Sequence, residues 1–267
     1  MTTQPLRNPH LFTLAGVLGL SLGLTLGCNQ PPPPGSEAGD SNDELNDDPS
    51  DSSDMGDGEP GDEPGDNTLY PLVDGASWTY RVTTISGQVL GEKGATLSEV
   101  TWNDQQAWLR SGNDEDDDDG LWSESVIIRE GPLALRVHKQ ENGPTGIIAL
   151  KDYDPGFARA SERWDTVGYK EELLYVRTET DEFGQEPDSK DRGHTYEVLA
   201  IEPLVVPAGT FAAAVKVERI RTVGKSSGEV VVSWYVPGVG KIREYRPADS
   251  RVEELTQVTI PGGVNLP

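Results

Sequence analysis

Short runs in which apolar and polar residues alternate dominate the last three quarters of the chain. One run places Trp78, Tyr80 and Val82 on one side and threonine or arginine on the other. A second run, in residues 133–138, places leucine and valine on one side and Arg136 on the polar side. Because successive side chains of an extended chain point to opposite faces, this period predicts strands with one buried and one solvent-facing side.

Gly, Pro, Asn or Asp interrupts these runs about every eight to twelve residues, which is typical of an antiparallel β-protein. Further candidate strands span 97–102, 107–110, 122–129, 146–150, 173–178, 195–201, 213–223, 229–236, 241–245 and 252–260. The run 229–236 is apolar on both faces, which predicts an interior strand of a covered sheet or one that faces a ligand cavity. Residues 155–164 are expected to form a short helix or irregular lid, and residues 181–192 a polar loop. We predict an all-β fold, a single antiparallel domain of about ten to twelve strands built as a curved sheet, an open β-barrel or a sandwich.

The N-terminus has the charge-then-hydrophobe order of a secretory signal peptide. Arg7 is followed by an uncharged apolar run over residues 11–27. A permanent signal anchor is the alternative, but four glycines make the run a poor membrane helix. We therefore predict that residues 1–27 are a lipoprotein signal peptide that is removed.

Cys28 is the only cysteine among the 267 residues, so it cannot form an internal disulfide. The preceding Thr25-Leu26-Gly27 resembles the lipobox of bacterial lipoproteins, although leucine is usual where Thr25 stands. We expect Cys28 to be cleaved free and acylated, with palmitate or a similar chain as a firm membrane anchor. Asn29 is not the aspartate that retains lipoproteins in the inner membrane of enteric bacteria, which favours the outer membrane and a cell-envelope location.

Residues 28–68 read as a disordered tether. They contain thirteen acidic residues, a run of four prolines, and neither a basic nor an aromatic residue, so they cannot bury enough apolar surface to offset the entropy of ordering. A spacer is the favoured interpretation, and a cation- or partner-binding tail is the alternative. The remaining residues, 69–267, form the β-rich globular domain, with 33 of the 46 acids against 21 Lys and Arg, a net charge of −12. This acidity disfavours nucleic acid as a partner.

Two motifs could carry chemistry, and both have a simpler interpretation. Residues 224–228, GKSSG, fit a hydrolase nucleophile motif and the end of a phosphate-binding loop, but both need a following helix, whereas strands flank this segment. His138 and His194 lie in separate segments and do not predict a zinc site. We expect a hairpin loop at residues 224–228, no catalytic residues and no enzymatic activity.

The densest acidic cluster is the segment 113–120, NDEDDDDG. Asp114, Asp116 and Asp118 are candidate calcium ligands, since calcium prefers carboxylate oxygens at alternate positions. An EF-hand is not predicted, because Val126 stands where the last ligand, a glutamate, belongs. A solvated hairpin tip is the default, and no other cofactor is expected. The tryptophans on the strands are expected to pack in the core rather than to bind glycans or lipids.

Three further blocks lie at turns. They are PLVDGASWTY over residues 71–80, VPAGTF over 206–211 and WYVPGVG over 234–240. Pro and Gly in the second and third blocks predict tight turns between strands. Together the blocks resemble the signatures of an uncharacterised family of bacterial secreted lipoproteins. The resemblance implies a fold similar in outline to the open β-barrels of periplasmic lipoprotein carriers.

We therefore expect a membrane-anchored envelope lipoprotein whose non-catalytic β-domain binds an unknown envelope protein or has a structural role. The alternative is a carrier or receptor for lipid or another apolar ligand inside an open β-barrel. The lipid on Cys28 would provide the contact with the membrane.

Overall fold

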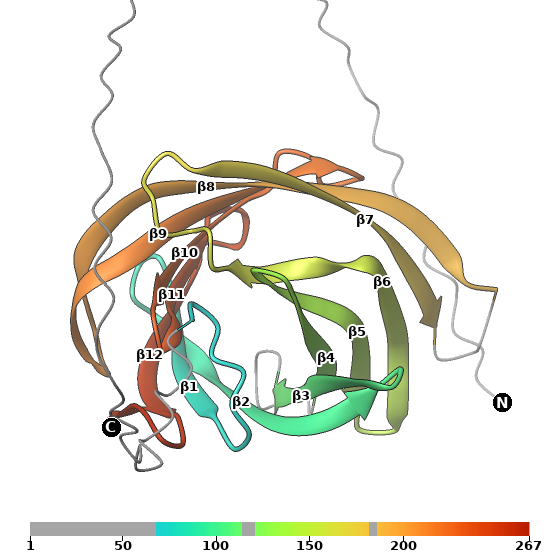
Figure 1. The fold of residues 1–267 in the computed structure, drawn as a ribbon, viewed down its shortest axis with the longest axis horizontal. Helices are drawn as coiled ribbons and strands as arrows, with labels where there is room; N and C mark the ends of the chain where they lie inside the picture. Colours follow the sequence, from blue (N-terminus) through green and yellow to red (C-terminus); the bar gives the residue numbers. More distant parts are fainter. Residues whose placement is uncertain (1–67, 114–120, 182–185, 267) are drawn as a thin grey trace, which may run out of the picture. The chain divides into compact units, whose positions relative to one another are not determined.

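In the computed structural model, thirteen strands form one continuous antiparallel sheet whose order follows the chain (Figure 1). The structure describes residues 68–113, 121–181 and 186–266. The strands are β1 (Ser77–Thr84), β2 (Val89–Trp102), β3 (Gln105–Asn113), β4 (Trp122–Glu130), β5 (Leu133–Gly143), β6 (Gly146–Ser161), β7 (Lys170–Asp181), β8 (Asp188–Val206), β9 (Gly209–Val223), β10 (Val230–Val236), β11 (Gly240–Arg246), β12 (Arg251–Thr259) and β13 (Asn265–Leu266). A short 3-10 helix, η2 (Pro247–Asp249), joins β11 to β12.

The first twelve strands close into a barrel. Strand β1 pairs with β12 from Ser77 opposite Thr259 to Thr84 opposite Arg251, and the two strands lie side by side in Figure 1. Strand β13 is an addition that pairs with the last two residues of β12. The prediction of an all-β antiparallel domain is confirmed, and among the architectures left open the barrel is the one formed. Because the barrel is closed, each of its twelve strands pairs with a neighbouring strand on both sides.

The alternation in β1 and the apolar run in β10 have the consequences expected of them. Trp78, Tyr80 and Val82 are buried while their neighbours are partly exposed. The five central residues of β10 are all buried, so β10 is an interior strand.

The prediction of a short helix or irregular lid at residues 155–164 is wrong. These residues continue β6 as far as Ser161. Within this part of β6, Phe157 lies opposite Arg136 of β5. The segment is rich in small residues, which mimic a helical composition, but its pairing with β5 determines the extended conformation. Tertiary pairing here overrides local propensity.

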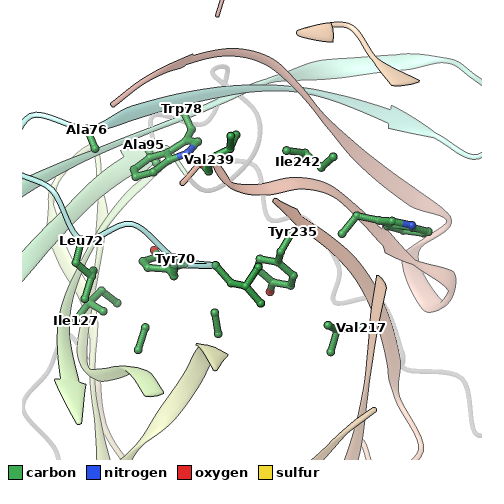
Figure 2. Close-up of a cluster of buried hydrophobic side chains, with 14 of the residues drawn as sticks. Tyr70, Leu72, Ala76, Trp78, Ala95, Ile127, Val217, Tyr235, Val239 and Ile242 are labelled. Carbon is green, nitrogen blue, oxygen red and sulfur yellow. Dashed lines mark hydrogen bonds between the residues drawn. The ribbon is translucent and has the colours of Figure 1, made fainter. Parts of the chain in front are cut away.

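One end of the barrel is closed by residues 68–76, which we call the plug. Tyr70 and Leu72 are buried, and the Tyr70 ring stacks on Trp78 with ring centroids 6.4 Å apart. Figure 2 shows Tyr70 among core side chains, with Leu72 close to Ile127 and Trp78 close to Val239. Backbone contacts fix the plug to the barrel, since the Gly238 amide donates to the Thr68 carbonyl at 2.9 Å and the Gly75 amide donates to the Leu97 carbonyl, also at 2.9 Å.

The three sequence blocks meet at this closed end. Residues 207–208 form the β8–β9 turn and residues 237–239 the β10–β11 turn, as their Pro and Gly residues predict. The Trp78 indole donates a hydrogen bond to the Val239 carbonyl at 2.7 Å. A Cβ at Gly240 would lie 3.3 Å from the indole nitrogen, so glycine allows this close approach.

The opposite end carries the β1–β2, β3–β4, β5–β6, β9–β10 and β11–β12 connections, because adjacent strands are antiparallel. We call it the open end. No helix within the described ranges is long and apolar enough to cross a membrane. The predicted signal peptide at residues 1–27, the lipidation site Cys28, residues 28–67 of the tether and the calcium candidates Asp114, Asp116 and Asp118 lie outside the described residues.

A cationic cavity as the candidate functional site

A cavity of about 570 Å³ occupies the barrel between the plug and the open end. Its lining contains eight cationic side chains and only two carboxylates, although residues 69–267 carry an excess of acids. The cationic residues are Lys93, Arg110, Arg136, Lys139, Arg159, Arg219, Lys241 and Arg246. Positive charge is therefore concentrated inside a domain whose net charge is negative.

Strands from opposite sides of the barrel bring these side chains together. Arg110 comes from β3, Arg136 from β5, Arg159 from β6 and Arg219 from β9. Arg136 faces inward with Phe157, its partner on the next strand. The Phe157 ring lies close to two of the guanidinium groups, with centroid distances of 5.8 Å to Arg136 and 5.1 Å to Arg219. Closure of the barrel is what makes residues far apart in sequence converge on one space.

Some of the cations are neutralised by a buried carboxylate network, formed by Glu253 and Glu244. The Lys241 ammonium lies 2.8 Å from each of these two carboxylates, and the Lys93 ammonium lies 3.3 Å from Glu253. The Arg246 Nε lies 2.7 Å from Glu244. These cations hold the pKa of Glu253 at about 2 and that of Glu244 well below its ordinary value, although burial alone would raise both.

Lys139 pairs with Glu141 at 2.8 Å. Four arginines remain, which we call the arginine cage: Arg110, Arg136, Arg159 and Arg219. Within the described part of the chain, no carboxylate lies within ion-pair distance of any of them. The buried Nε atoms of Arg136 and Arg159 also have no hydrogen-bond partner among these residues. Arg110 is buried and the other three are partly buried. Burial alone would lower the pKa of Arg159, but the nearby Tyr70, Tyr235 and Glu244 raise it. An enclosed cation without a counter-charge costs several kcal/mol.

The cage creates a strong positive potential at the floor of the cavity. Burial, together with the charges of Arg159 and Arg110, lowers the pKa of Arg136 to about 10. Burial would raise the pKa of the Tyr70 hydroxyl, yet Arg159 and Arg110 hold it below its ordinary value. Burial keeps the pKa values of Tyr80 and Tyr235 above the ordinary value, so the effect of the arginines is strongest at Tyr70.

The cavity opens to solvent beside Leu121, Trp122 and Ile148, which we call the collar. Their exposed fractions are 40%, 43% and 40%, and all three line the cavity. Leu121 and Ile148 approach the same point on β5, because a Cβ at Gly143 would lie 2.9 Å from one Ile148 methyl carbon and 3.7 Å from one of Leu121. One side of the mouth is thus apolar, next to Lys139 and Glu141 of the same lining, and the interior is cationic.

The sites considered from sequence lie elsewhere. Residues 224–228 form the predicted loop between β9 and β10, with a strand and not a helix after it. His138 contacts Asp152 at 2.6 Å on the surface, whereas His194 is buried, and its pKa is lowered to about 3 by burial and by neighbouring arginines such as Arg219. No group of three metal-ligating side chains occurs in the described ranges.

The tryptophans divide as core packing predicts, with one exception. Trp78, Trp108, Trp164 and Trp234 are buried, and Trp102 is partly buried. Trp122 is the exposed member, in the collar. Sequence reasoning did not identify the arginine cage, because its members are single charged residues on separate strands and each resembles an ordinary solvent-facing position.

Comparisons with known proteins give two similar folds. No protein-family model and no curated protein matches the chain. A crystal structure from Bacteroides fragilis NCTC 9343, provisionally described as an exported protein with YmcC-like fold, has 12% identity and a TM-score of 0.46, covering 72% of this chain and 99% of that chain. A structure from Parabacteroides distasonis ATCC 8503, provisionally described as a lipoprotein, has 15% identity and a TM-score of 0.39, with the same coverages. At these identities the likeness concerns the path of the backbone.

Proposed function

We propose that the protein is a lipid-anchored, non-catalytic binding protein of the bacterial cell envelope, and that its barrel holds an anionic ligand. The anchor part of this proposal rests on Cys28 and the segments around it. The ligand part rests on one observation, the four arginines of the cage that have no carboxylate partner. An anionic ligand would supply the missing counter-charge.

Arginine suits this role because its planar guanidinium donates paired hydrogen bonds to phosphate, sulfate or carboxylate oxygens. Four such groups around one space match a ligand with two or more negative charges. A wholly apolar ligand is a poorer match, since it would leave the four arginines of the cage without water or counter-ions.

The enclosed position of the cage also explains how an acidic protein could attract an anion. The acids lie mostly elsewhere in the domain, whereas charges inside a low-dielectric cavity act strongly over short distances. Binding inside the barrel would therefore be selective for ligands that can enter the open end.

Calorimetric titration with pyrophosphate, a compact polyanion, tests the ligand part. The processed Cys28→Ser chain, produced directly without residues 1–27, avoids detergent because it has no acyl group. We expect binding, and we expect Arg136→Met and Arg219→Met each to weaken it at least tenfold, since a charge-assisted hydrogen bond contributes about 1.5–3 kcal/mol.

Arg81→Met is the matched control, because Arg81 is paired with Glu254 outside the cage and is 43% exposed in its side chain. It should leave the affinity unchanged. Absence of pyrophosphate binding, or binding that survives both cage substitutions, would overturn the proposal.

The anchor is tested by labelling cells with a radioactive fatty acid. The unaltered chain should take up label and fractionate with membranes, whereas Cys28→Ser should take up no label and leave an uncleaved or soluble form. Continued labelling of Cys28→Ser would contradict the assignment of Cys28.

A further inference from the structure

The cavity is much larger than a small inorganic anion requires. Its volume of about 570 Å³ is equivalent to nearly twenty water molecules at about 30 Å³ each. It falls within the range of about 300–1,000 Å³ that is typical of sites for whole organic ligands. An anionic group bound at the cage would leave most of the space to the rest of the ligand.

The remaining surface between the cage and solvent indicates what that rest is. The collar forms one side of the mouth, where two aliphatic side chains and one tryptophan are about two-fifths exposed. Phe157 provides a further apolar surface deeper in the cavity, between Arg136 and Arg219. Exposed aliphatic residues at the entrance of a charged cavity cost free energy unless a ligand covers them.

The strand directions place the collar and the arginine cage toward opposite ends of the cavity. Trp122 begins β4 and Ile148 lies near the start of β6, so both stand at the open end. Arg110 and Arg159 lie at the other end of the cavity, where they also line a small space beside Tyr70 of the plug. A ligand that extends from the cage to the collar passes Lys139 and Glu141 of β5 and then reaches the apolar side of the mouth.

We infer that the ligand is an anionic amphiphile whose charged headgroup binds the arginine cage and whose apolar chain leaves through the collar. The inference rests on the proposed function, since it assigns a chemical class to the ligand of the same cavity. A hydrophilic polyanion, such as a phosphorylated sugar, would use the cage without needing the collar.

Two probes with the same headgroup separate these classes. Methyl phosphate and octyl phosphate are titrated into the processed Cys28→Ser chain, with octyl phosphate below its micelle concentration. Each methylene buried against apolar surface strengthens binding about fourfold. We therefore expect octyl phosphate to bind at least tenfold more tightly than methyl phosphate.

Substitutions in each region should separate the two contributions. Trp122→Ser combined with Ile148→Ser should remove most of the octyl advantage and change the Kd of methyl phosphate less than twofold. Arg136→Met should weaken both ligands at least tenfold. Val205→Ser is the control, because Val205 is 70% exposed on β8 and does not line the cavity, so the ratio of the two Kd values should not change.

The outcomes distinguish the inference from the proposed function. Equal affinities for the two phosphates would overturn the amphiphile and leave anion binding intact. An octyl advantage that survives the double collar substitution, or octyl phosphate binding that is insensitive to Arg136→Met, would also overturn the inference. Failure of both phosphates to bind would overturn the inference and the proposed function together.

Discussion

Replacing Arg136 by methionine should make the ligand-free barrel more stable while weakening its binding of anions. Arg136 is a partly buried cation of the cavity lining beside Arg159 and Arg110, and no carboxylate among the described residues lies within ion-pair distance of it. Most charged residues in protein interiors behave in the opposite way, because their removal leaves a partner unpaired. The sign of the change in stability therefore tests whether the cage is built for an absent counter-charge.

The magnitude follows from the pKa of Arg136, which is lowered from 12.5 to about 10. At about 1.4 kcal/mol per pKa unit, the folded protein disfavours the charged form by about 3 kcal/mol. At pH 7 the guanidinium is charged in both the folded and the unfolded state, so the whole penalty is present. It is relieved only as the pH rises through about 10 toward 12.5.

Methionine keeps part of the aliphatic packing of Arg136, and water in the cavity screens part of the repulsion. We therefore expect the free energy of unfolding to rise by about 1–2 kcal/mol. Urea unfolding followed by tryptophan fluorescence, in a buffer free of phosphate and sulfate, measures this change.

Arg129→Met is the matched control. Arg129 lies 2.6 Å from Glu162 and donates to the plug at Thr68, so its replacement should lower the free energy of unfolding by about 1–2 kcal/mol. If Arg136→Met instead lowered the stability by about 2 kcal/mol or more, Arg136 would be a structural residue and the reasoning would be refuted.

Three further predictions concern other parts of the molecule. Glu253 is fully buried among cations that hold its pKa near 2, so its stabilising effect is present above pH 4.5 and declines as the pH falls toward 2. In urea unfolding, Glu253→Gln should lower the free energy of unfolding by about 3 kcal/mol at pH 7 and by about 1 kcal/mol at pH 3. A loss that does not depend on pH would contradict this. Trp78→Phe removes the 2.7 Å hydrogen bond to the Val239 carbonyl and should lower the free energy of unfolding by about 1–3 kcal/mol. Trp122→Phe should change it by less than about 0.5 kcal/mol. Equal effects of the two substitutions would argue that the indole hydrogen bond of Trp78 does not stabilise the fold. Millimolar calcium should raise the melting temperature if the loop that contains residues 114–118 binds it, and asparagine at the three aspartates proposed as ligands should abolish the rise; no rise in the unaltered protein would end the calcium hypothesis.

Much of the fold follows from the chain's local patterns. The period of two in β1 places Trp78 and Tyr80 in the core, and the apolar run of β10 becomes an interior strand. The Pro and Gly residues of two sequence blocks form the turns that they predict. These features depend on neighbours in sequence, which a single sequence shows directly.

The candidate site depends on information of another kind. Arg136 falls on the expected polar face of its run, but register shifts in β5 interrupt the pairing on both sides of it, and its side chain lines the cavity. The period of two predicts which residues share a face of a strand, but not whether a polar face is turned to bulk water or enclosed by a barrel. Closure through β1 and β12 decides this, and it joins residues that are 167 to 182 positions apart.

The same reason explains the misassigned segment in β6. Residues 155–161 contain alanines that favour a helix locally, but their extended form depends on pairing with β5. Phe157 and Arg159 could be placed in the site only once that pairing was known.

A crystal structure of the processed chain grown with tungstate tests the central claim most directly. Tungstate carries two negative charges, and its anomalous scattering locates it without ambiguity. We predict a tungstate ion inside the barrel, within hydrogen-bond distance of at least two guanidinium groups of the arginine cage. A cavity free of tungstate in crystals that hold the ion only on the outer surface would contradict the claim.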